Sequence, residues 1–481
     1  MKTIRELRVL ALTILFSVNA SAAERPPNII LLLADDLGWS SLGCYGNTLH
    51  ETPNLDRLAM RGMRFTDAYS ACTVCSPTRA SLLTGKYPAR LRVTDFIAGQ
   101  NRPYEKLTIP DWTKHLHPTE TTIAEALRKA GYATAHVGKW HLEAKTSVPG
   151  MPAEQFQPTA QGFDTSVDKP AGSRGYFLPK NFNHADGSTG GYVTDYLTDE
   201  ALKVIERNRK QPFFLYFAYH NPHTPIQAKA ELTAHYEKKL ASRPDIKIRN
   251  ATYAAMIHSL DESVGRVVAK VDDLGLGDNT VILFVSDNGG LTQRNGKIDN
   301  IADNSPLRRG KGSAYEGGVR VPMIARWPGK VDARSECRVP VSTIDFFPTA
   351  LALAGAKTAA YPNIDGTSIV PLLKNPGTRF SRESLYWHYP HYHAGGDAPY
   401  SAVRRSNWKL IDFHDDTPDA LYDLASDIGE AKNLIQAEVK QAKQLRRSLR
   451  QWRQRVRAQM PTKNPDHDPT KAGIAVKRKR R

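Results

Sequence analysis

Four nearly continuous runs of apolar residues stand out along the chain, and each run ends at a group of polar residues. The runs cover residues 28–34, 132–137, 213–219 and 281–285. Continuous apolar runs are typical of strands that are covered on both faces, as in a parallel sheet. The pattern therefore predicts four buried strands at the centre of the protein.

Helical patterns lie between these strands, over residues 122–130, 195–208 and 253–274. Alternation of strands and helices predicts an α/β fold, in which helices flank a mostly parallel sheet. In such sheets the ligand crevice lies beyond the carboxyl ends of the strands. The polar groups that follow the four runs are all expected at that edge of the sheet.

The region after residue 382 has a different pattern. Short aromatic and β-branched runs, at residues 383–388, 401–403 and 408–413, predict a small antiparallel sheet. A helix is expected over residues 430–457, because apolar residues three or four positions apart form one stripe. The stripe consists of Val439, Ala442, Leu445, Leu449, Trp452 and Val456. Residues after 461 are expected to be disordered.

The first residues have the pattern of an export signal. Three basic residues, Lys2, Arg5 and Arg8, precede an apolar run at 9–18 and small residues at 20–23. The run is too short to span a bilayer, which favours a cleaved signal peptide at residues 1–23 over an uncleaved tether. A lipid anchor is disfavoured because no cysteine directly follows the small residues to carry the lipid. The mature protein is therefore expected to be exported, periplasmic or secreted, and to have no membrane span.

The formal net charge of +17 is concentrated near the end of the chain. From Lys440 onward there are 15 Lys and Arg residues and two Asp residues. The rest of the chain is nearly neutral, so the folded body lacks the basic surface that a nucleic-acid-binding protein needs. No nucleic-acid partner is expected, and the basic end is a solvated tail or a contact for anionic surfaces and polysaccharides.

Four cysteines, Cys44, Cys72, Cys75 and Cys337, are too few for a disulfide framework in a chain of 481 residues. Cys72 and Cys75 form one C-x-x-C pair, which leaves a redox role open. Pro77 suits the first turn of a helix and places Cys75 at its amino terminus. There, free backbone N–H groups and the helix dipole favour an anion. A reactive or structural cysteine at a helix start has the same local pattern.

Adjacent carboxylates at a strand end are a second candidate for chemistry. Asp35 and Asp36 repel each other unless a cation joins them. Asp287 and Asn288 supply two further oxygens at another strand end. Hard oxygen ligands suit Ca²⁺ or Mg²⁺ better than zinc. Two aspartates after a strand are also common in caps and turns, so these residues by themselves leave both interpretations open.

The segment Cys-Ser-Pro-Thr-Arg-Ala-Ser-Leu-Leu-Thr-Gly, from Cys75 to Gly85, resembles the maturation motif of type I, formylglycine-dependent sulfatases. That family belongs to the alkaline-phosphatase superfamily, and the resemblance extends from residue 27 to residue 424. It implies an alkaline-phosphatase-like catalytic α/β domain at residues 24–375. A smaller α+β domain, the antiparallel sheet plus helix, is expected at 376–460, followed by the basic tail at 461–481.

The resemblance also implies a set of site residues. Cys75 is oxidised by a formylglycine-generating maturation enzyme to 3-oxoalanine (formylglycine), whose aldehyde is hydrated. Ca²⁺, or Mg²⁺ in its place, is held by the modified Cys75 and four oxygen-bearing side chains: Asp35, Asp36, Asp287 and Asn288. The remaining catalytic residues are cationic or acid–base groups: Arg79, Lys139, His141, His223 and Lys311.

In the implied reaction, one hydroxyl of the hydrated aldehyde attacks the sulfur of a sulfate ester. Arg79, Lys139 and Lys311 balance the developing charge, and His223 protonates the leaving alcohol. His141 then helps the second hydroxyl to lose its proton, which expels sulfate and restores the aldehyde. The resemblance thus implies a sulfatase of the arylsulfatase or glycosulfatase type that removes sulfate from sulfated carbohydrates.

The segment Trp387-His-Tyr-Pro-His-Tyr-His393 places aromatic rings and imidazoles close together in the sequence. Aromatic faces stack on sugar rings, and imidazoles form hydrogen bonds with hydroxyl groups. His388, His393 and Arg404 are therefore candidate substrate contacts, together with His220. A packed hinge between domains, and a loop histidine at position 220, are the alternatives.

Two other functions stay open on the sequence. A phosphonate or phosphate ester hydrolase of the same superfamily is the nearer one, although a conventional two-zinc phosphatase needs several His ligands beside its Asp residues. A non-catalytic carbohydrate-binding relative would tolerate loss of Cys75 or of a metal ligand, and none is missing. The sequence departs from the family pattern at Asp427-Ile428, where Asp-Pro is common, and this turn position bears on local geometry rather than on chemistry.

Overall fold

The computed structural model describes residues 25–184, 187–294, 297–298 and 301–476. Within these residues the largest sheet has eight strands, in the order β12-β2-β11-β8-β1-β7-β5-β6. Its strands are β1 (Asn28–Ala34), β2 (Met63–Phe65), β5 (Ala133–Gly138), β6 (Thr165–Val167), β7 (Phe213–Ala218), β8 (Thr280–Ser286), β11 (Met323–Arg326) and β12 (Ser335–Cys337). Neighbouring strands are parallel except where β11 pairs with β2 and β8. The predicted mostly parallel sheet is confirmed.

The four predicted strands are β1, β5, β7 and β8, which are neighbours at the centre of the sheet. Strand β1 matches its predicted range, and each end of the other three lies within one residue of the prediction. Leu31 of β1 lies opposite Tyr216 of β7 and Leu283 of β8. Because the three strands run parallel in this register, the polar residues that follow them emerge at one edge of the sheet.

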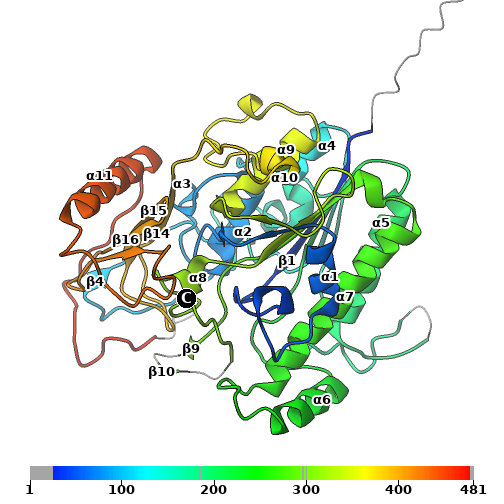
Figure 1. Cartoon of the computed structure of the whole chain (residues 1–481), viewed down its shortest axis with the longest axis horizontal. Helices are drawn as coiled ribbons and strands as arrows, with labels where there is room; N and C mark the ends of the chain where they lie inside the picture. The colour runs from blue at the N-terminus through cyan, green and yellow to red at the C-terminus, as the bar shows by residue number, and fades with distance from the viewer. Residues whose placement is uncertain (1–24, 185–186, 295–296, 299–300, 477–481) are drawn as a thin grey trace, which may run out of the picture.

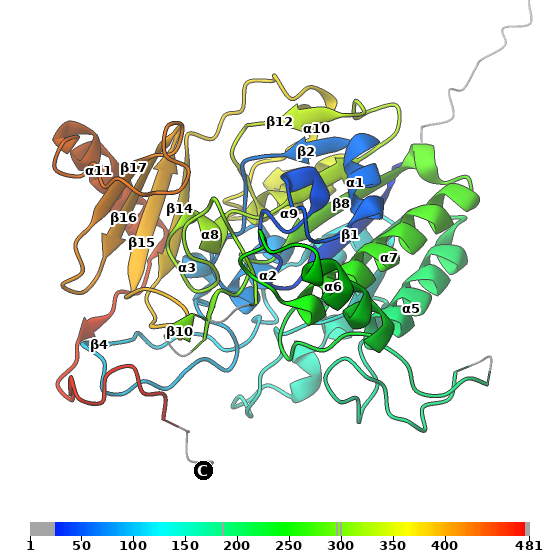
Figure 2. The same ribbon diagram turned by 60° about the horizontal axis from the view of Figure 1, so that its bottom comes forward.

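Helices cover both faces of the sheet, as expected for strands without polar alternation. Successive residues of β1 point to opposite faces, so Ile29 and Leu31 belong to one core and Ile30 and Leu32 to the other. The first core is completed by α2 (Cys75–Thr84), α4 (Ile123–Lys129), α9 (Phe346–Leu353) and α10 (Val370–Lys374). The second is completed by α1 (Pro53–Met60), α5 (Val193–Asn208) and α7 (Ala251–Asp273), which lie together on one side in Figures 1 and 2.

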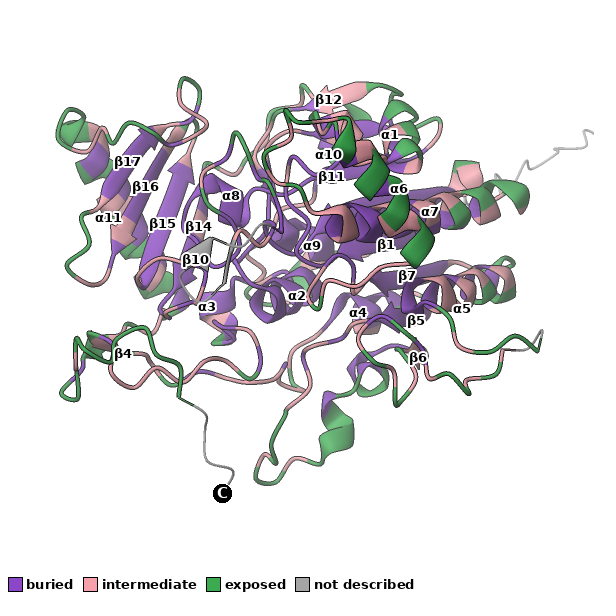
Figure 3. Ribbon diagram, turned by 90° about the horizontal axis from the view of Figure 1, so that it is seen from below, coloured by how far each residue is buried: buried purple, intermediate pink, exposed green. Residues whose placement is uncertain are grey.

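Helix α2 is buried along its whole length, unlike the amphipathic helices at the surface (Figure 3). It begins at Cys75, after Val74 in an extended conformation, and Pro77 lies in its first turn, where no intrahelical N–H bond is lost. It ends at Gly85, whose φ of 69° terminates the helix in a left-handed conformation. The predicted helix start at Cys75 is confirmed, and the first turn of α2 is held inside the protein.

The carboxy-terminal region forms a second, antiparallel sheet in the order β14-β15-β16-β17, with helix α11 packed against it (Figure 2). Its elements are β14 (Ser384–Tyr389), β15 (Tyr400–Arg405), β16 (Trp408–Phe413), β17 (Ala420–Asp423) and α11 (Val439–Val456). The predicted sheet is confirmed, and five members of the apolar stripe, Ala442, Leu445, Leu449, Trp452 and Val456, are buried. Val439 is the exception, because it is the first residue of α11 and is 61% exposed. Strand β17 was not predicted as a strand.

The start of the last helix differs from the prediction, because α11 begins at Val439 and not at 430. Glu430 has a φ of 52°, which a right-handed helix excludes. Its buried carboxylate accepts a hydrogen bond from the backbone N–H of Glu316 at 2.6 Å and pairs with Lys409 at 3.0 Å. These contacts fix the chain in a bend before the helix.

The segment expected to be disordered is ordered from residue 461 to residue 476. Strand β18 (Thr462–Lys463) pairs with β4 (Leu107–Thr108). The Asn464 amide donates to the carbonyl of Pro103 at 2.8 Å and to that of Glu105 at 2.6 Å. The prediction failed because composition does not show that a polar segment can bond to another loop of the same chain. Residues 477–481 and the signal peptide predicted at 1–23 lie outside the described residues.

The shorter elements connect these layers. They are α3 (Pro88–Leu91), α6 (Ala230–Ala241), α8 (Glu316–Val319), β3 (Ala68–Tyr69), β9 (Gln293–Arg294), β10 (Lys297–Ile298) and β13 (Val341–Ser342). Among the described residues, none of the helices has the length and apolar character that a membrane crossing needs.

Candidate active site

The acidic residues predicted to act together meet beyond the carboxyl ends of β1 and β8. The Asp36 N–H donates to Asp287 Oδ1 at 3.1 Å, and Asn288 Nδ2 donates to Asp36 Oδ1 at 2.8 Å. Asp35, Asp36, Asp287 and Asn288 are at most 2% exposed. Parallel pairing of β1 with β8 therefore brings two dipeptides, about 250 residues apart in sequence, into one buried cluster.

The cluster has the donor set and the unfilled bonding capacity of a cation site. Ligand atoms of Asp35, Cys75 and Asp287 lie within 4.8 Å of one another. Among the described residues, Asp35 Oδ1 and Asn288 Oδ1 are buried and accept no hydrogen bond. Burial and the neighbouring Asp35 carboxylate raise the pKa of Asp287 to about 7. These oxygens fit a hard cation such as Ca²⁺ or Mg²⁺, which would satisfy them and relieve the repulsion between carboxylates.

Cys75 lies at this cluster as the first residue of α2 and is 1% exposed. Its position at a helix amino terminus favours negative charge on whatever group the residue carries. Burial raises the pKa of the Cys75 thiol, and burial likewise raises that of Cys72. A redox-active C-x-x-C pair has a lowered thiol pKa, so the electrostatics do not favour the redox alternative.

Arg79 follows one helical turn after Cys75, and its side chain is fully buried. Its Nε and Nη2 atoms both donate to Asp287 Oδ2, at 2.9 and 2.8 Å. Nη1 donates to the Lys139 carbonyl at 2.9 Å, and Nη2 lies 3.5 Å from Asp35 Oδ1. The planar guanidinium thus joins α2 to the ends of β1, β5 and β8.

Two lysines bring positive charge to the two aspartates of β1. Lys139 Nζ lies 2.6 Å from Asp35 Oδ2, and Lys311 Nζ lies 2.7 Å from Asp36 Oδ1. Burial opposes ionisation of both aspartates, but the ammonium groups outweigh it and hold both carboxyl pKa values below the usual range. The same pairing raises the pKa of both lysines, so all four groups are charged at neutral pH.

Each of the two predicted acid–base histidines uses one ring nitrogen in a hydrogen bond to a backbone carbonyl. The other ring nitrogen is Nδ1 in His141 and Nε2 in His223. His141 Nε2 donates to the Ile97 carbonyl at 2.6 Å, and its buried Nδ1 has no hydrogen-bond partner among the described residues. Burial, followed by the positive charge of Lys139, lowers the pKa of His141 well below its ordinary value. His223 Nδ1 donates to the Thr224 carbonyl at 2.6 Å, and Nε2 lies 3.6 Å from Asp36 Oδ2. Burial lowers the pKa of His223 to about 4.

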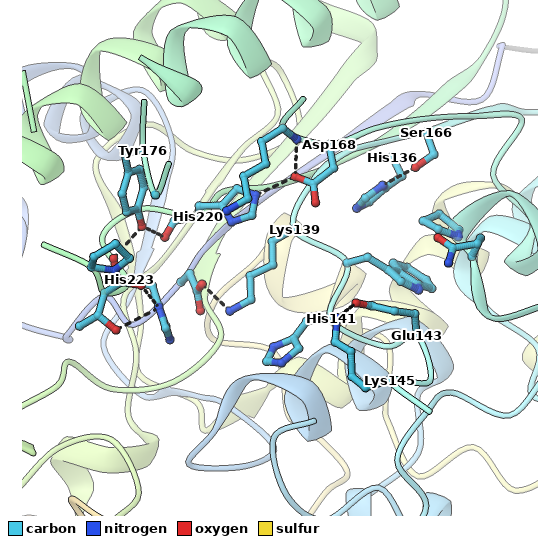
Figure 4. A pocket seen from close by; sticks show the side chains of 18 residues that line it. His136, Lys139, His141, Glu143, Lys145, Ser166, Asp168, Tyr176, His220 and His223 are labelled. Atoms are coloured by element: carbon cyan, nitrogen blue, oxygen red, sulfur yellow. Dashed lines mark hydrogen bonds and ion pairs between the residues drawn. The ribbon is translucent and has the colours of Figure 1, made fainter. Parts of the chain in front are cut away.

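A cavity of about 500 Å³ opens beside this cluster, and Figure 4 shows its walls. Asp35, Lys139, His141 and His223 line it, and so does His220. Further lining residues were not singled out from the sequence: His136, Trp140, Glu143, Lys145, Ser166, Asp168, Lys169 and Tyr176. His136 and Ser166 lie within β5 and β6, and Trp140 follows shortly after β5. The others come from loops, where isolated charged residues carry no sequence signal that separates them from solvated surface.

The segment from His220 to His223 is fixed by contacts that the sequence did not reveal. His220 Nε2 donates to Asp168 Oδ1 at 2.7 Å. The Tyr176 hydroxyl donates to the His223 carbonyl at 2.7 Å and also to that of His220. His220 is therefore an oriented side chain of the cavity wall.

Three predicted substrate contacts do not line this cavity. His388 is buried, with Nδ1 at 2.8 Å from Ser401 Oγ and Nε2 at 2.9 Å from the Gln459 carbonyl. Arg404 pairs with Asp67 at 2.7 Å and donates to Tyr69, so its donors are also used within the protein. His388 and Arg404 therefore pack within the second sheet, and the geometry does not support a contact between either side chain and a substrate in this cavity.

His393 lies closer to the chemistry than the other two. It is 9% exposed, and a Cβ placed on Gly312 would lie 2.0 Å from its Nδ1. The ring therefore packs directly against the glycine that follows Lys311. This contact makes His393 a support for the Lys311 loop.

Comparisons with known proteins place the chain in a family. A family model described as "Sulfatase" matches residues 27–356, and one described as "N-sulphoglucosamine sulphohydrolase, C-terminal" matches residues 310–459. The first match covers more than half of the chain. The chain belongs to the sulfatase family, within the alkaline-phosphatase superfamily.

Three relatives of this chain are named as sulfatases of different kinds. It is 31% identical to a sulfatase of Formosa agariphila, over 89% of each chain. It is 34% identical to human N-acetylgalactosamine-6-sulfatase, over 77% of this chain and 70% of the relative, and 33% identical to human arylsulfatase A, over 86% and 84%.

Solved structures agree with this assignment. The crystal structure of Ps i-CgsB is 32% identical, with a TM-score of 0.73, and the match covers 93% of this chain and 96% of that one. The phosphonate monoester hydrolase of Agrobacterium radiobacter has the same fold at 21% identity, with a TM-score of 0.65 over 90% and 96% of the two chains. Fold by itself therefore does not separate sulfate esters from phosphonate esters.

Proposed function

We propose that this sulfatase removes sulfate from a sulfated saccharide, with a hydrated formylglycine made from Cys75 as the nucleophile. The observation that carries the proposal is the position of Cys75. It lies at the start of a buried helix, with carboxylates suited to a cation on one side and the ammonium groups of Lys139 and Lys311 nearby. An anionic ester group is stabilised where cations converge in a site shielded from water.

The bound cation is assigned to Asp35, Asp36, Asp287, Asn288 and the modified residue 75. Ca²⁺ is the first choice and Mg²⁺ the second, because all the unmodified donors are oxygens. When bound, the ion would polarise the sulfate group and favour ionisation of a hydroxyl.

The modification explains how turnover continues. The hydrated aldehyde has one hydroxyl to attack sulfur and a second whose deprotonation releases sulfate and restores the aldehyde. Because Cys75 is 1% exposed, a formylglycine-generating maturation enzyme would have to reach it before the chain has folded. The maturation enzyme is thus the proposed protein partner.

His223 and His141 each carry out one of the two proton transfers of the reaction. His223 gives a proton from Nε2 to the leaving alcohol, and the negative charge of a bound sulfate raises its pKa toward the working range. His141 takes a proton at Nδ1, the nitrogen that has no hydrogen-bond partner among the described residues. The depressed pKa of His141 keeps this nitrogen unprotonated at neutral pH, as a base requires.

A saccharide is proposed as substrate because of the cavity wall. Glu143, Lys145, Asp168 and His220 line the cavity, and such groups bind hydroxyls, amides and further charges. A relative 32% identical is named steryl-sulfatase, but a sterol is apolar and does not suit this charged wall. Other relatives are named for an amino sugar, and Ps i-CgsB is titled in complex with k-i-k-neocarrahexaose. His220 is proposed as a substrate contact.

Export is proposed from the leader at residues 1–23, with the periplasm or the outside of the cell as the destination. Amino-terminal sequencing of the protein from its source tests this proposal. A first residue near position 24 supports it, and a chain that begins at Met1 contradicts it.

The test of function compares nitrophenyl sulfate with matched phosphate and phosphonate esters, on protein matured at Cys75 and supplied with Ca²⁺. Sulfate ester turnover should exceed the other two by orders of magnitude. Cys75→Ala should lose turnover and keep the wild-type circular dichroism spectrum. Preference for the phosphonate ester favours the alternative hydrolase, and full activity in Cys75→Ala refutes the mechanism. A folded, matured protein that binds sulfated sugars without turnover would be a non-catalytic relative.

A further inference from the structure

Two adjoining cavities lie where the second sheet, helix α11 and the chain segment between α10 and β14 meet. Their volumes are about 470 and 310 Å³, and both are lined by Arg382, Glu383, Ser384 and Arg405. We call this combined depression the basic groove. None of its lining residues lines the cavity beside Cys75.

The groove carries more positive charge than its own acids neutralise. Five arginines line it, which are Arg379, Arg382, Arg404, Arg405 and Arg455. Arg382 and Arg404 are held by Asp345 and Asp67, and Arg405 pairs with Glu383 at 3.0 Å. Arg379 and Arg455 are exposed and have no ion pair among the described residues. Two cations therefore stay available to a ligand, one in each of the two cavities.

The smaller cavity also has features that suit a sugar. The Tyr386 and Trp452 rings stack at 4.9 Å with an interplanar angle of 4°. The Trp452 side chain is buried, lines the cavity, and its indole N–H has no hydrogen-bond partner among the described residues. Ser448 and Gln451 add polar groups beside it. An unsatisfied buried donor next to cations indicates an oxygen-rich anionic ligand.

Helix α11, which supplies part of the groove, also carries a separate row of cations. Lys440, Lys443, Arg447 and Arg450 follow one another at three- or four-residue spacing, so they share one face of the helix. All four are exposed and have no ion pair within the described part of the chain. The buried stripe of α11 lies on the opposite face, so packing does not require this row of cations.

We propose that the basic groove binds a second, non-reacting part of a sulfated polysaccharide while another part occupies the catalytic cavity. This rests on the proposed function, because a sulfatase substrate that is a polymer carries more than one sulfate. The groove is a depression with an indole N–H, a serine and a glutamine beside separated arginines, which suits sugar hydroxyls and spaced sulfates. A duplex nucleic acid would instead need a continuous track of phosphate contacts.

The test compares two double charge reversals. Arg379→Glu with Arg455→Glu changes the groove. Arg128→Glu with Lys210→Glu is the matched control, because those cations are exposed, lack ion pairs among the described residues and lie just before the amino ends of β5 and β7, outside the residues that line the groove. The readouts are the affinity of the full chain for fluorescent dextran sulfate, with neutral dextran and duplex DNA as comparisons, and kcat/KM on nitrophenyl sulfate.

We expect the groove variant to bind dextran sulfate about tenfold more weakly and the control to change by less than about twofold. Both variants should keep the wild-type kcat/KM on nitrophenyl sulfate. Equal loss in both variants, no loss in either, or duplex DNA binding as tight as dextran sulfate at the same ionic strength overturns the inference. The binding readout needs no turnover, so absence of sulfatase activity would refute the proposed function and leave the groove separately tested.

Discussion

Replacement of Arg79 tests the electrostatic core of the site. The side chain is fully buried, donates twice to Asp287 and once to the Lys139 carbonyl, and lies near Asp35. In protein stripped of divalent cations for the melting assay, Arg79→Ala would leave the buried Asp287 without its guanidinium counter-ion. Removal of one partner from a buried ion pair costs about 3–5 kcal/mol.

This cost can be converted into a melting temperature. A chain of this length unfolds with an entropy of about 1 kcal/mol per kelvin, so Arg79→Ala should melt about 3–5 °C below the wild type. Arg79→Lys keeps the charge but loses the planar geometry that serves Asp287 and the carbonyl together, so it should fall in between. Both variants should lose sulfate ester turnover.

The assay is differential scanning fluorimetry, with kcat on nitrophenyl sulfate measured in parallel. Arg128→Ala is the control, because Arg128 is exposed and its loss should change stability by less than about 0.5 kcal/mol. If Arg79→Ala melts within about 1 °C of the wild type, Arg79 is not the counter-ion that the buried geometry indicates.

Three further predictions follow from single features of the site and the second sheet. Removal of divalent cations with EDTA should abolish turnover and Ca²⁺ should restore it; activity that survives chelation contradicts the assignment of Asp35 and Asp287 as ligands. His141→Phe should release about one equivalent of nitrophenol per active site and then stop, because the base for the second proton is gone; continued turnover would remove His141 from that role. Burial lowers the pKa of His388 to about 4, so below about pH 6.5 the unfolded chain binds a proton that the folded chain excludes. Stability should therefore fall as pH drops from 6.5 to 4, and the melting temperature of His388→Gln should fall less steeply; identical pH profiles would show that His388 does not contribute.

The central sheet was predictable because burial leaves a strong signal in the sequence. β1, β7 and β8 are apolar on both faces, and each is followed by polar residues, so both their existence and the location of the site could be read from the chain. Asp35, Asp36, Asp287 and Asn288 could be expected together for the same reason, since strand topology brings strand ends together. Cys75, Arg79 and Lys311 follow no strand of this sheet, and only the family resemblance assigned them to the site. Their roles came from family resemblance, because an isolated lysine such as Lys311 looks like any surface lysine.

The substrate contacts predicted from the second sheet illustrate what the sequence does not reveal, namely partners that are distant in the chain. His388 and Arg404 looked like ligand-binding groups, but Ser401, Gln459 and Asp67 use their polar atoms. The sequence does not distinguish a polar side chain that bonds to a buried partner from one that is available to bind a ligand.

Tertiary contacts also determine whether the last segment is ordered and where the last helix begins. Residues 461–476 are ordered by hydrogen bonds to the loop at 101–108, and α11 starts late because Glu430 is drawn into a buried pair with Lys409. Local composition and periodicity carry no record of either contact.

The central claim is that Cys75 becomes the nucleophile of a sulfate ester hydrolase, and peptide mass spectrometry across residue 75 tests it most directly. The protein should be isolated from its source, or produced together with a maturation enzyme, and assayed on nitrophenyl sulfate in the same preparation. The account predicts an aldehyde or its hydrate at residue 75, in a fraction of molecules that rises in proportion to specific activity. Unmodified cysteine in a fully active preparation would contradict it.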